Sequence, residues 1–316
     1  MRVLMPQTIH PQIEFLGKPE MCVYLLQGKE YMIVEGGMSY LVPSMLQQFK
    51  DRQIDPSRIT RLLLLHSHFD HCGIAPFFKR MIPQLKVVGS KRSQELYQKE
   101  KVVQFIRARN REMLEFLKME KAAELNLDFD QVAVDEVVGE GDIIDLGEGL
   151  RVRIIEMPGH SSCSIAAYVE SLKALFPSDA GGIPGEGEEI FPAGNENYLL
   201  YQKSLEKLRP LGVEILGAAR NGAFVGKEAR EFIPRSIEAA EKMRQEVIQQ
   251  CQGQENLEEK IIQIAKKRYE GLKTRDIPWE VYIPLIRGII KNILQNYEKR
   301  NLKEAVSNQL SAKKLK

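Results

Sequence analysis

The sequence predicts an α/β protein whose chain ends in helices, and three observations carry this prediction. Short apolar runs bounded by glycine-containing turns recur up to residue 216, as they do in proteins built from strands. Segments with apolar residues at helical spacing separate many of these runs. From Glu228 onward the pattern is almost purely helical. At 316 residues the chain is long enough for one large domain or for a domain with an appendage.

The first elements are short strands, followed by a helix and a more apolar strand. Gly-Lys and Gly-Gly turns separate the first three strands. Four consecutive leucines in Arg61–Leu65 are typical of a central strand that is buried on both faces. Up to residue 89 we therefore expect strands at 13–16, 21–26, 31–35, 61–65 and 86–89, and helices at 41–51 and 74–81.

A long helical segment precedes the next group of strands. Leu96, Val103 and Ile106 lie at helical spacing and predict a helix over residues 93–125. After it we expect strands at 132–138, 142–146, 150–156, 174–177 and 213–216, an acidic loop at 183–195 and a helix at 198–208. The C-terminal pattern predicts helices at 228–251, 257–272 and 284–303.

The composition is that of an ordinary globular protein, with 43% apolar and 28% charged residues. The formal net charge is +2, and no basic stretch is interleaved with aromatic residues, so we expect no nucleic-acid partner. Residues 1–17 lack a signal-peptide pattern, and no apolar run approaches the roughly 20 residues that cross a bilayer, so we expect no membrane partner. The cysteines are scattered, which fits a reducing cytoplasm.

The reactive side chains are concentrated where the leucine-rich strand ends. His66, His68, Asp70 and His71 lie within six residues of one another. Alternate side chains of an extended segment share a face, so His66 and His68 can point the same way. Imidazole with carboxylate is the ligand chemistry of zinc, iron or manganese rather than of calcium or magnesium. Only five histidines exist in the chain, and this concentration favours a metal site over a polar loop; His10 is expected to be a surface or turn residue.

The pattern His66-x-His68-x-Asp70-His71 after an apolar strand resembles the metal-binding signature of the metallo-β-lactamase superfamily. The resemblance covers about residues 1–232 and implies an αββα sandwich with the metal site at one sheet edge. Residues 233–316 would then form a helical C-terminal extension that covers or flanks the active site. The resemblance also implies the roles of the ligands: His66, His68 and His160 for a first metal, Asp70 and His71 for a second, and Asp179 as a bridge between the two.

One position departs from the family pattern. The superfamily closes its ligand set with a histidine in a Gly-His segment, and Arg220 aligns with that histidine here. A guanidinium stays protonated and has no lone pair to give to a metal. The second metal position has therefore lost a ligand. Arg220 either replaces the second metal as a charge near Asp70 and Asp179, grips an anionic group of the substrate, or points outward.

Within the superfamily, the ligand spacing and the helical extension are most similar to glyoxalase II-type and quinolone-signal-response-type thioesterases, the latter sharing His71-Cys72-Gly73. This likeness implies a metal-dependent hydrolase of a thioester or related ester, holding one or two divalent transition metals. Zinc is the first expectation, and iron and manganese are alternatives. A bound ion lowers the pKa of its water from about 15.7 to about 7, which supplies hydroxide at neutral pH. Asp70 would be the catalytic residue that steers this water or takes its proton.

Two other classes of function stay open. A mononuclear iron bound by two histidines and one carboxylate suits oxygen chemistry, as in a persulfide dioxygenase of the same superfamily. A regulatory protein that keeps the fold and the metal but does little chemistry is the other class, and Arg220 favours it. The expected partner is a small-molecule substrate, and the sequence leaves open whether the chain forms a homodimer. It does not fix the substrate or the native metal.

Overall fold

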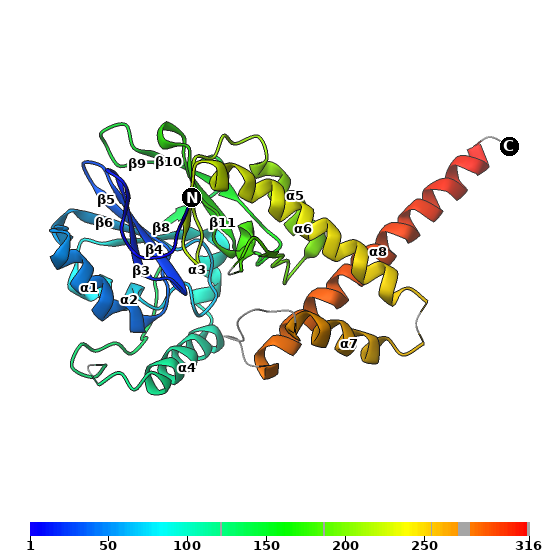
Figure 1. Ribbon diagram of the computed structural model, residues 1–316, viewed down its shortest axis with the longest axis horizontal. Coiled ribbons are helices and arrows are strands. Elements are labelled where there is room, and N and C mark those ends of the chain that lie inside the picture. The colour runs from blue at the N-terminus through cyan, green and yellow to red at the C-terminus, as the bar shows by residue number, and fades with distance from the viewer. Residues whose placement is uncertain (121, 186, 254, 271–278, 315–316) are drawn as a thin grey trace.

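Two seven-stranded sheets pack face to face, and helices cover the outer surface of each (Figure 1). A computed structural model describes residues 1–120, 122–185, 187–253, 255–270 and 279–314. In spatial order the first sheet consists of β2 (Thr8–His10), β3 (Ile13–Lys18), β4 (Met21–Gln27), β5 (Tyr31–Val34), β6 (Ile59–Leu63), β7 (Lys86–Ser90) and β8 (Glu136–Val138). The second consists of β1 (Arg2–Val3), β16 (Ala223–Val225), β15 (Ile215–Gly217), β12 (Ala174–Phe176), β11 (Ile165–Val169), β10 (Arg151–Glu156) and β9 (Ile143–Asp145). A separate hairpin pairs β13 (Ile183–Pro184) with β14 (Ile190–Phe191).

The helices form the two outer layers and the C-terminal extension. The first sheet is covered by α1 (Val42–Asp51), α2 (Ala75–Met81), α3 (Lys91–Tyr97) and α4 (Glu100–Phe116). The second is covered by α5 (Tyr198–Leu208) and the start of α6 (Lys227–Cys251). The chain continues into α7 (Leu257–Glu270) and α8 (Trp279–Lys314). Short 3₁₀ helices are η1 (Ser39–Leu41), η2 (Pro56–Arg58), η3 (Glu170–Leu172) and η4 (Ser178–Gly181).

The leucine-rich segment shows how the sequence builds this sandwich. β6 lies inside the first sheet between β5 and β7 and is parallel to both. Successive side chains of a strand point to opposite faces. Leu62 and Leu64 accordingly pack in the cluster between the sheet and its helices, whereas Leu63 and Leu65 pack in the cluster between the two sheets. All four leucines are fully buried, so the predicted central strand and the αββα layers are confirmed.

The helix expected over residues 93–125 is interrupted. Lys99 is extended between α3 and α4, and α4 ends at Phe116. Lys118 adopts the left-handed region with φ 48°, and the N–H of Met119 bonds the carbonyl of Leu114 at 3.0 Å. This arrangement satisfies carbonyls that the ended helix leaves free. The turn uses lysine in place of the usual glycine, so the sequence carries no sign of it.

The second sheet contains three strands that the sequence did not predict: β1, β11 and β16. β11 is entirely buried between β10 and β12, and its sequence Ile165–Val169 has two alanines, which are less common in strands, next to Ile165. β16 pairs with β15 and with β1, close to Arg220. β11 and β16 thus each have a hydrogen-bonded partner strand on both sides, which stabilises these short segments.

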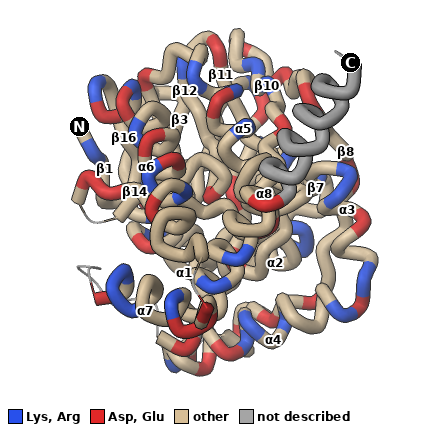
Figure 2. Tube along the Cα trace, turned by 90° about the vertical axis from the view of Figure 1, so that its right-hand side faces the viewer, with Lys and Arg blue, Asp and Glu red and all other residues tan. Residues whose placement is uncertain are grey.

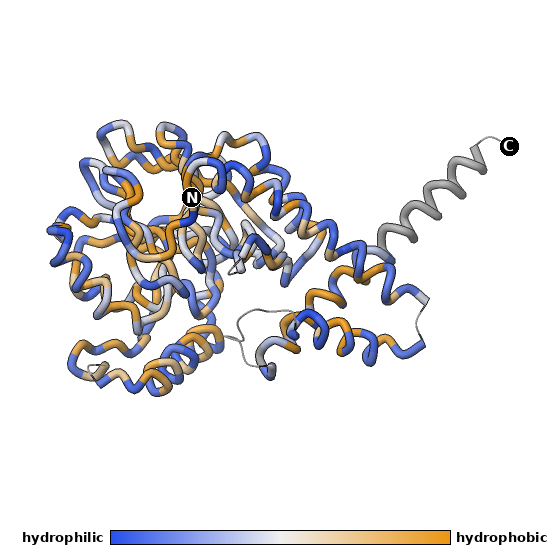
Figure 3. The backbone as a smooth tube through the Cα atoms, viewed as in Figure 1, coloured by the Kyte–Doolittle hydropathy of each residue, from blue (hydrophilic) through white to orange (hydrophobic). Residues whose placement is uncertain are grey.

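The C-terminal extension is built on α6, which projects from the sandwich toward α7 and α8 (Figure 1). α6 runs without a break through residues 232 and 233, where the sequence places a domain boundary, and that division stays a prediction. Apolar and polar residues alternate along α7 and along the coloured part of α8 (Figure 3), and the apolar ones form a cluster with residues of α5 and α6. Basic and acidic residues are interspersed along the chain (Figure 2). Within the described ranges, no helix has the length and apolarity to cross a membrane.

Candidate metal centre

Segments from both sheets deliver the candidate ligands to one edge of the sandwich. His66 follows β6, and His160 lies in the turn between β10 and β11. Asp179 lies in η4 directly after β12, and Arg220 lies in the turn between β15 and β16. The contacts described below join all the residues predicted for the site, which are His66, His68, Asp70, His71, His160, Asp179 and Arg220.

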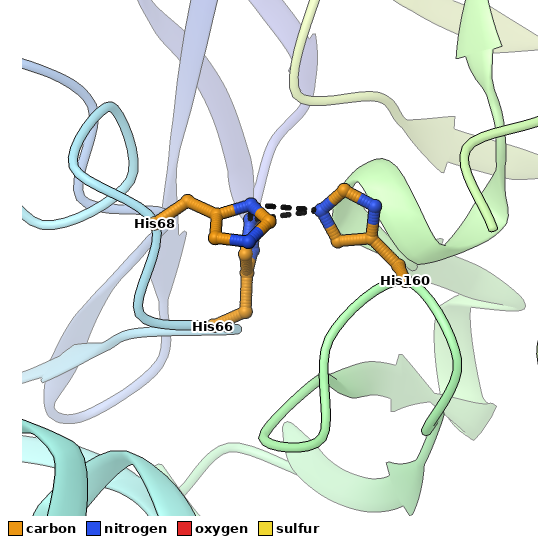
Figure 4. A group of neighbouring side chains, drawn as sticks. All are labelled: His66, His68 and His160. Atoms are coloured by element: carbon orange, nitrogen blue, oxygen red, sulfur yellow. Dashed lines mark hydrogen bonds between the residues drawn. The ribbon is translucent and has the colours of Figure 1, made fainter. Parts of the chain in front are cut away.

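Three histidine rings converge on one point, and we call His66, His68 and His160 the histidine triangle (Figure 4). Nε2 of His66 lies 3.1 Å from Nδ1 of His68, and Nε2 of His160 lies 3.2 Å and 3.1 Å from these two atoms. Nitrogen ligands around a tetrahedral zinc are about 3.3–3.4 Å apart, because each Zn–N bond is about 2.0–2.1 Å long. The spacing of the triangle therefore fits a bound divalent ion.

Contacts on the far side of two rings fix which nitrogen faces the centre. Nδ1 of His160 donates to the carbonyl of Ala193 at 2.8 Å, which leaves the lone pair of Nε2 free. Ser178 Oγ lies 3.2 Å from Nδ1 of His66, so Nε2 of that ring is likewise the inward atom. Neither Ala193 nor Ser178 was predicted, because neither a carbonyl nor a turn serine carries a sequence signal for this role.

The protonation state of the triangle also suits metal binding. Burial lowers the pKa of His66 well below its ordinary value, and the neighbouring imidazoles add to this effect. Burial lowers the pKa of His68 to about 4 and also lowers the pKa of His160. All three rings are therefore neutral at pH 7, and a metal needs neutral imidazole as its ligand.

His71 stands beside the triangle in a different environment. Its Nδ1 lies 2.9 Å from Glu35 Oε2, and its Nε2 lies 3.3 Å from Asp179 Oδ2 and 3.7 Å from Asp70 Oδ2. Burial lowers the pKa of His71, but the carboxylates of Asp179, Glu35 and Asp70 outweigh burial and hold this pKa well above the ordinary value. Among the described residues, His66, His71 and Asp179 form a second group that could hold an ion.

Arg220 points into the site and contacts two of its carboxylates. Its Nη2 donates to Asp70 Oδ2, and its Nε lies 3.9 Å from Asp179 Oδ1. Burial raises the pKa of Asp70, but the positive charges of His71 and Arg220 outweigh burial and keep this pKa below the usual value. Asp70 belongs to neither of the metal-capable groups found in the described part of the chain. The outward orientation considered for Arg220 is therefore wrong.

Glu35 is a charged residue beside the candidate ligands that the sequence analysis did not predict. It follows β5, is 1% exposed, and adopts φ 78°, which is uncommon for a residue other than glycine. Its Oε1 atom is buried without a hydrogen-bond partner within the described structure, while Oε2 contacts His71. Backbone strain and an unpaired buried oxygen are typical of functional sites. The available signal was an acidic residue between a buried strand and Gly36-Gly37.

The backbone around His160 is packed closely against α5. Gly159 has φ 130°, and a Cβ atom there would lie 2.1 Å from the backbone nitrogen of Tyr201. The carbonyl of Gly159 accepts hydrogen bonds from the N–H groups of Glu196 and Asn197 at 3.0 and 2.9 Å. Only glycine fits this position, so the Pro-Gly turn before His160 is a requirement of packing.

Comparison with known proteins decides the family. The sequence profile of the metallo-β-lactamase superfamily matches residues 18–220, which contain the histidine triangle and end at Arg220. The chain belongs to the metallo-β-lactamase superfamily. A curated relative from Aspergillus fumigatus, atrochrysone carboxyl ACP thioesterase, is 22% identical over 191 residues, 60% of this chain and 47% of that protein. The match thus spans about half the length of that relative.

Solved structures share the fold. A metallo-β-lactamase family protein from Thermus thermophilus superposes with a TM-score of 0.65 at 16% identity, over 92% of this chain and 95% of that one. A β-lactamase domain protein from Burkholderia ambifaria also gives a TM-score of 0.65, at 18% identity, over 92% of this chain and 88% of that one. At such identities the likeness establishes the αββα architecture, including most of the helical extension.

Proposed function

We propose that this protein is a metal-dependent hydrolase that cleaves a thioester or a related ester. The observation that carries the proposal is the convergence of three neutral imidazole nitrogens, 3.1–3.2 Å apart, at the edge of the sandwich. Each ring directs a lone pair to the same point, and three lone pairs cannot form hydrogen bonds with one another. One cation at that point would interact favourably with all three nitrogens. Membership of the metallo-β-lactamase superfamily supports the same assignment.

The histidine triangle would hold the ion, with Asp179 as a fourth donor. Asp179 Oδ2 lies 4.0 Å from Nε2 of His160, on the side that faces His71. Nitrogen-rich ligands with one carboxylate favour zinc first, with iron and manganese as alternatives. A bound divalent ion would supply Lewis-acid chemistry and a water of lowered pKa.

Asp70 has the position and charge to orient the attacking water. Arg220 and His71 keep its carboxylate ionised, and an ionised carboxylate is a strong hydrogen-bond acceptor. Its depressed pKa makes it better suited to aligning a water than to storing a proton. Asp70 is therefore the proposed catalytic residue, and its contact with Arg220 fixes the direction of its oxygens.

A thioester is the preferred substrate class. Thiolate is a better leaving group than alkoxide, so cleavage of a thioester requires less stabilisation of the departing atom. Such a reaction suits a centre that holds one ion at the histidine triangle. The Aspergillus fumigatus relative is named as a thioesterase, which supports this choice at low identity. The acyl group and the carrier of the thiol are left to experiment.

The test is turnover by metal-replete protein on acyl thioesters of graded chain length, with the matching oxygen esters alongside. Released thiol can be followed directly, because the four cysteines of the protein are buried. Asp70→Asn should lower kcat by about 10²–10⁴-fold with the fold intact by circular dichroism. Asp55→Asn is the matched control, since Asp55 caps η2 at the surface and should leave kcat unchanged.

Two outcomes would redirect the assignment. Iron in the purified protein together with oxygen consumption would favour the persulfide-dioxygenase-like alternative. Metal binding without cleavage of any thioester or ester would favour a regulatory protein.

A further inference from the structure

We propose that the guanidinium of Arg220 is a built-in substitute for a second metal ion, so that the centre binds one divalent ion tightly and does not bind two. This inference rests on the proposed metal site at the histidine triangle. It concerns the number of ions in the site, which membership of the superfamily leaves undetermined.

The position of Arg220 leaves no free place for a second ion beside Asp70. Arg220 donates to Asp70 and approaches Asp179 to 3.9 Å, so its charge lies between carboxylates that would otherwise face a second cation. The Arg220 side chain is 25% exposed and the Asp70 side chain 15% exposed, so solvent screens their attraction only in part. A second ion bound through Asp70 would first have to displace this pair, and breaking a largely buried pair is costly.

The described side chains supply too few ligands for a second ion. The two metal-capable groups among the described residues share His66. A neutral imidazole has one lone pair, and Nε2 of His66 already faces the triangle at 3.1 Å from His68. If His66 binds the ion at the histidine triangle, only His71 and Asp179 of the second group are left as ligands for another ion. Two protein ligands are fewer than the three that catalytic zinc sites usually have.

The net charge of the centre also favours a single ion. We call Glu35, Asp70 and Asp179 the carboxylate trio; its three side chains, each with little exposed surface, surround His71 and carry three negative charges. Arg220 and His71 supply two positive charges and a single divalent ion supplies two more, so the centre with one ion already carries one net positive charge. A second divalent ion would add further positive charge to a buried site, and a buried net charge is strongly unfavourable.

The experiment compares the number of tightly bound ions in the wild type, Arg220→His and Arg220→Lys. Each protein is stripped with a chelator, dialysed against graded Zn²⁺ and analysed by elemental mass spectrometry. A parallel series loaded with Mn²⁺ is examined by electron paramagnetic resonance, because two neighbouring Mn²⁺ ions couple magnetically and a single ion does not. We expect one ion in the wild type, two in Arg220→His, and one in Arg220→Lys, which keeps the charge.

Arg52→His is the matched control. Arg52 pairs with Glu14 at 2.9 Å, its side chain is 20% exposed, and neither residue belongs to the candidate site. This variant also loses a largely buried arginine–carboxylate pair and gains a histidine, so its count of one ion shows that the effect depends on position 220.

The outcomes separate this inference from the proposed function. The role of Arg220 would be overturned by two equally tight ions in the wild type. It would also be overturned if Arg220→His bound only one ion at a Zn²⁺ concentration tenfold above the first dissociation constant. Neither result would contradict the hydrolase proposal. No tight ion in the wild type would overturn the metal centre itself, and with it both proposals. Two tight ions in the wild type would overturn the role of Arg220 even if Arg220→His fails to fold.

Discussion

Asn292 of α8 accepts a hydrogen bond from the backbone N–H of Tyr198 at 3.0 Å, and its side-chain amide donates to the carbonyl of Glu196. The C-terminal extension thereby holds the loop that precedes α5. The same loop contributes the carbonyl of Ala193 to His160 and two N–H groups to Gly159. Asn292 of the extension is thus connected to the candidate metal ligand His160 through this loop.

We therefore expect Asn292→Ala to weaken metal binding, although Asn292 touches no ligand. Partners that orient a ligating histidine typically change metal affinity by about 10–100-fold, and Asn292 acts through one more contact, so a loss of about tenfold is expected. The measurement is competition for Zn²⁺ with a chromophoric chelator. Gln245→Ala, an exposed change on α6, is the control. An unchanged affinity in Asn292→Ala would show that the loop is rigid without the extension.

Removal of single histidines should distinguish the histidines that bind metal from those that do not. His66→Ala and His160→Ala each take away one nitrogen of the triangle and should reduce the metal content of purified protein to a small fraction of the wild-type value. His10→Ala should leave the metal content at the wild-type level, because His10 lies in β2 and belongs to neither metal-capable group. Elemental analysis of the three variants, purified identically, checks this. A stoichiometric loss in His10→Ala would contradict the assignment.

Gly159→Ala should be far more damaging than a comparable change elsewhere. Its Cβ would overlap the backbone of Tyr201, so α5 or the His160 turn must shift, and we expect a loss of more than about 3 kcal/mol in the free energy of unfolding. Gly149→Ala is the control: Gly149 also has positive φ, at 76°, but nothing lies within 4 Å of its Cβ position. That variant should lose only about 1 kcal/mol from backbone strain. Equal losses in urea unfolding would refute the packing argument.

The metal-free protein should lose stability as the pH falls from about 6.5 to about 4. The folded pKa values of the triangle histidines lie below those of the unfolded chain, so the unfolded state binds more protons in this range. Their contribution is present above the unfolded pKa and declines as the pH drops toward the folded one. His71 has the opposite sign: its raised folded pKa stabilises the protein at low pH, and this contribution declines as the pH rises through that value.

Urea unfolding of metal-free protein at several pH values tests this dependence. His68→Gln removes one titrating ring and should flatten the decline between about pH 6.5 and about pH 4. A variant with the same slope as the wild type would show that His68 is not buried in its neutral form.

The sequence by itself determined features that depend on near neighbours. The uninterrupted apolar run Leu62–Leu65 predicted a central strand, because consecutive side chains of a strand face opposite layers and here both layers are buried. The helix expected at residues 198–208 matches α5, where Asn197 caps the first turn and apolar residues recur at helical spacing. The ligand types in His66–His71 indicated a transition-metal site, since their chemistry is local.

Only the tertiary structure decided which distant residues meet. His160 lies 94 residues from His66, and Arg220 lies 150 residues from Asp70, and no local pattern encodes either distance. The packing of the two sheets brings the ends of their strands to one edge, and this edge places Arg220 against Asp70 and Glu35 against His71. Charge and hydrogen-bond partners follow from that packing, so the sequence could name the residues of the centre but not the contacts that set their chemistry.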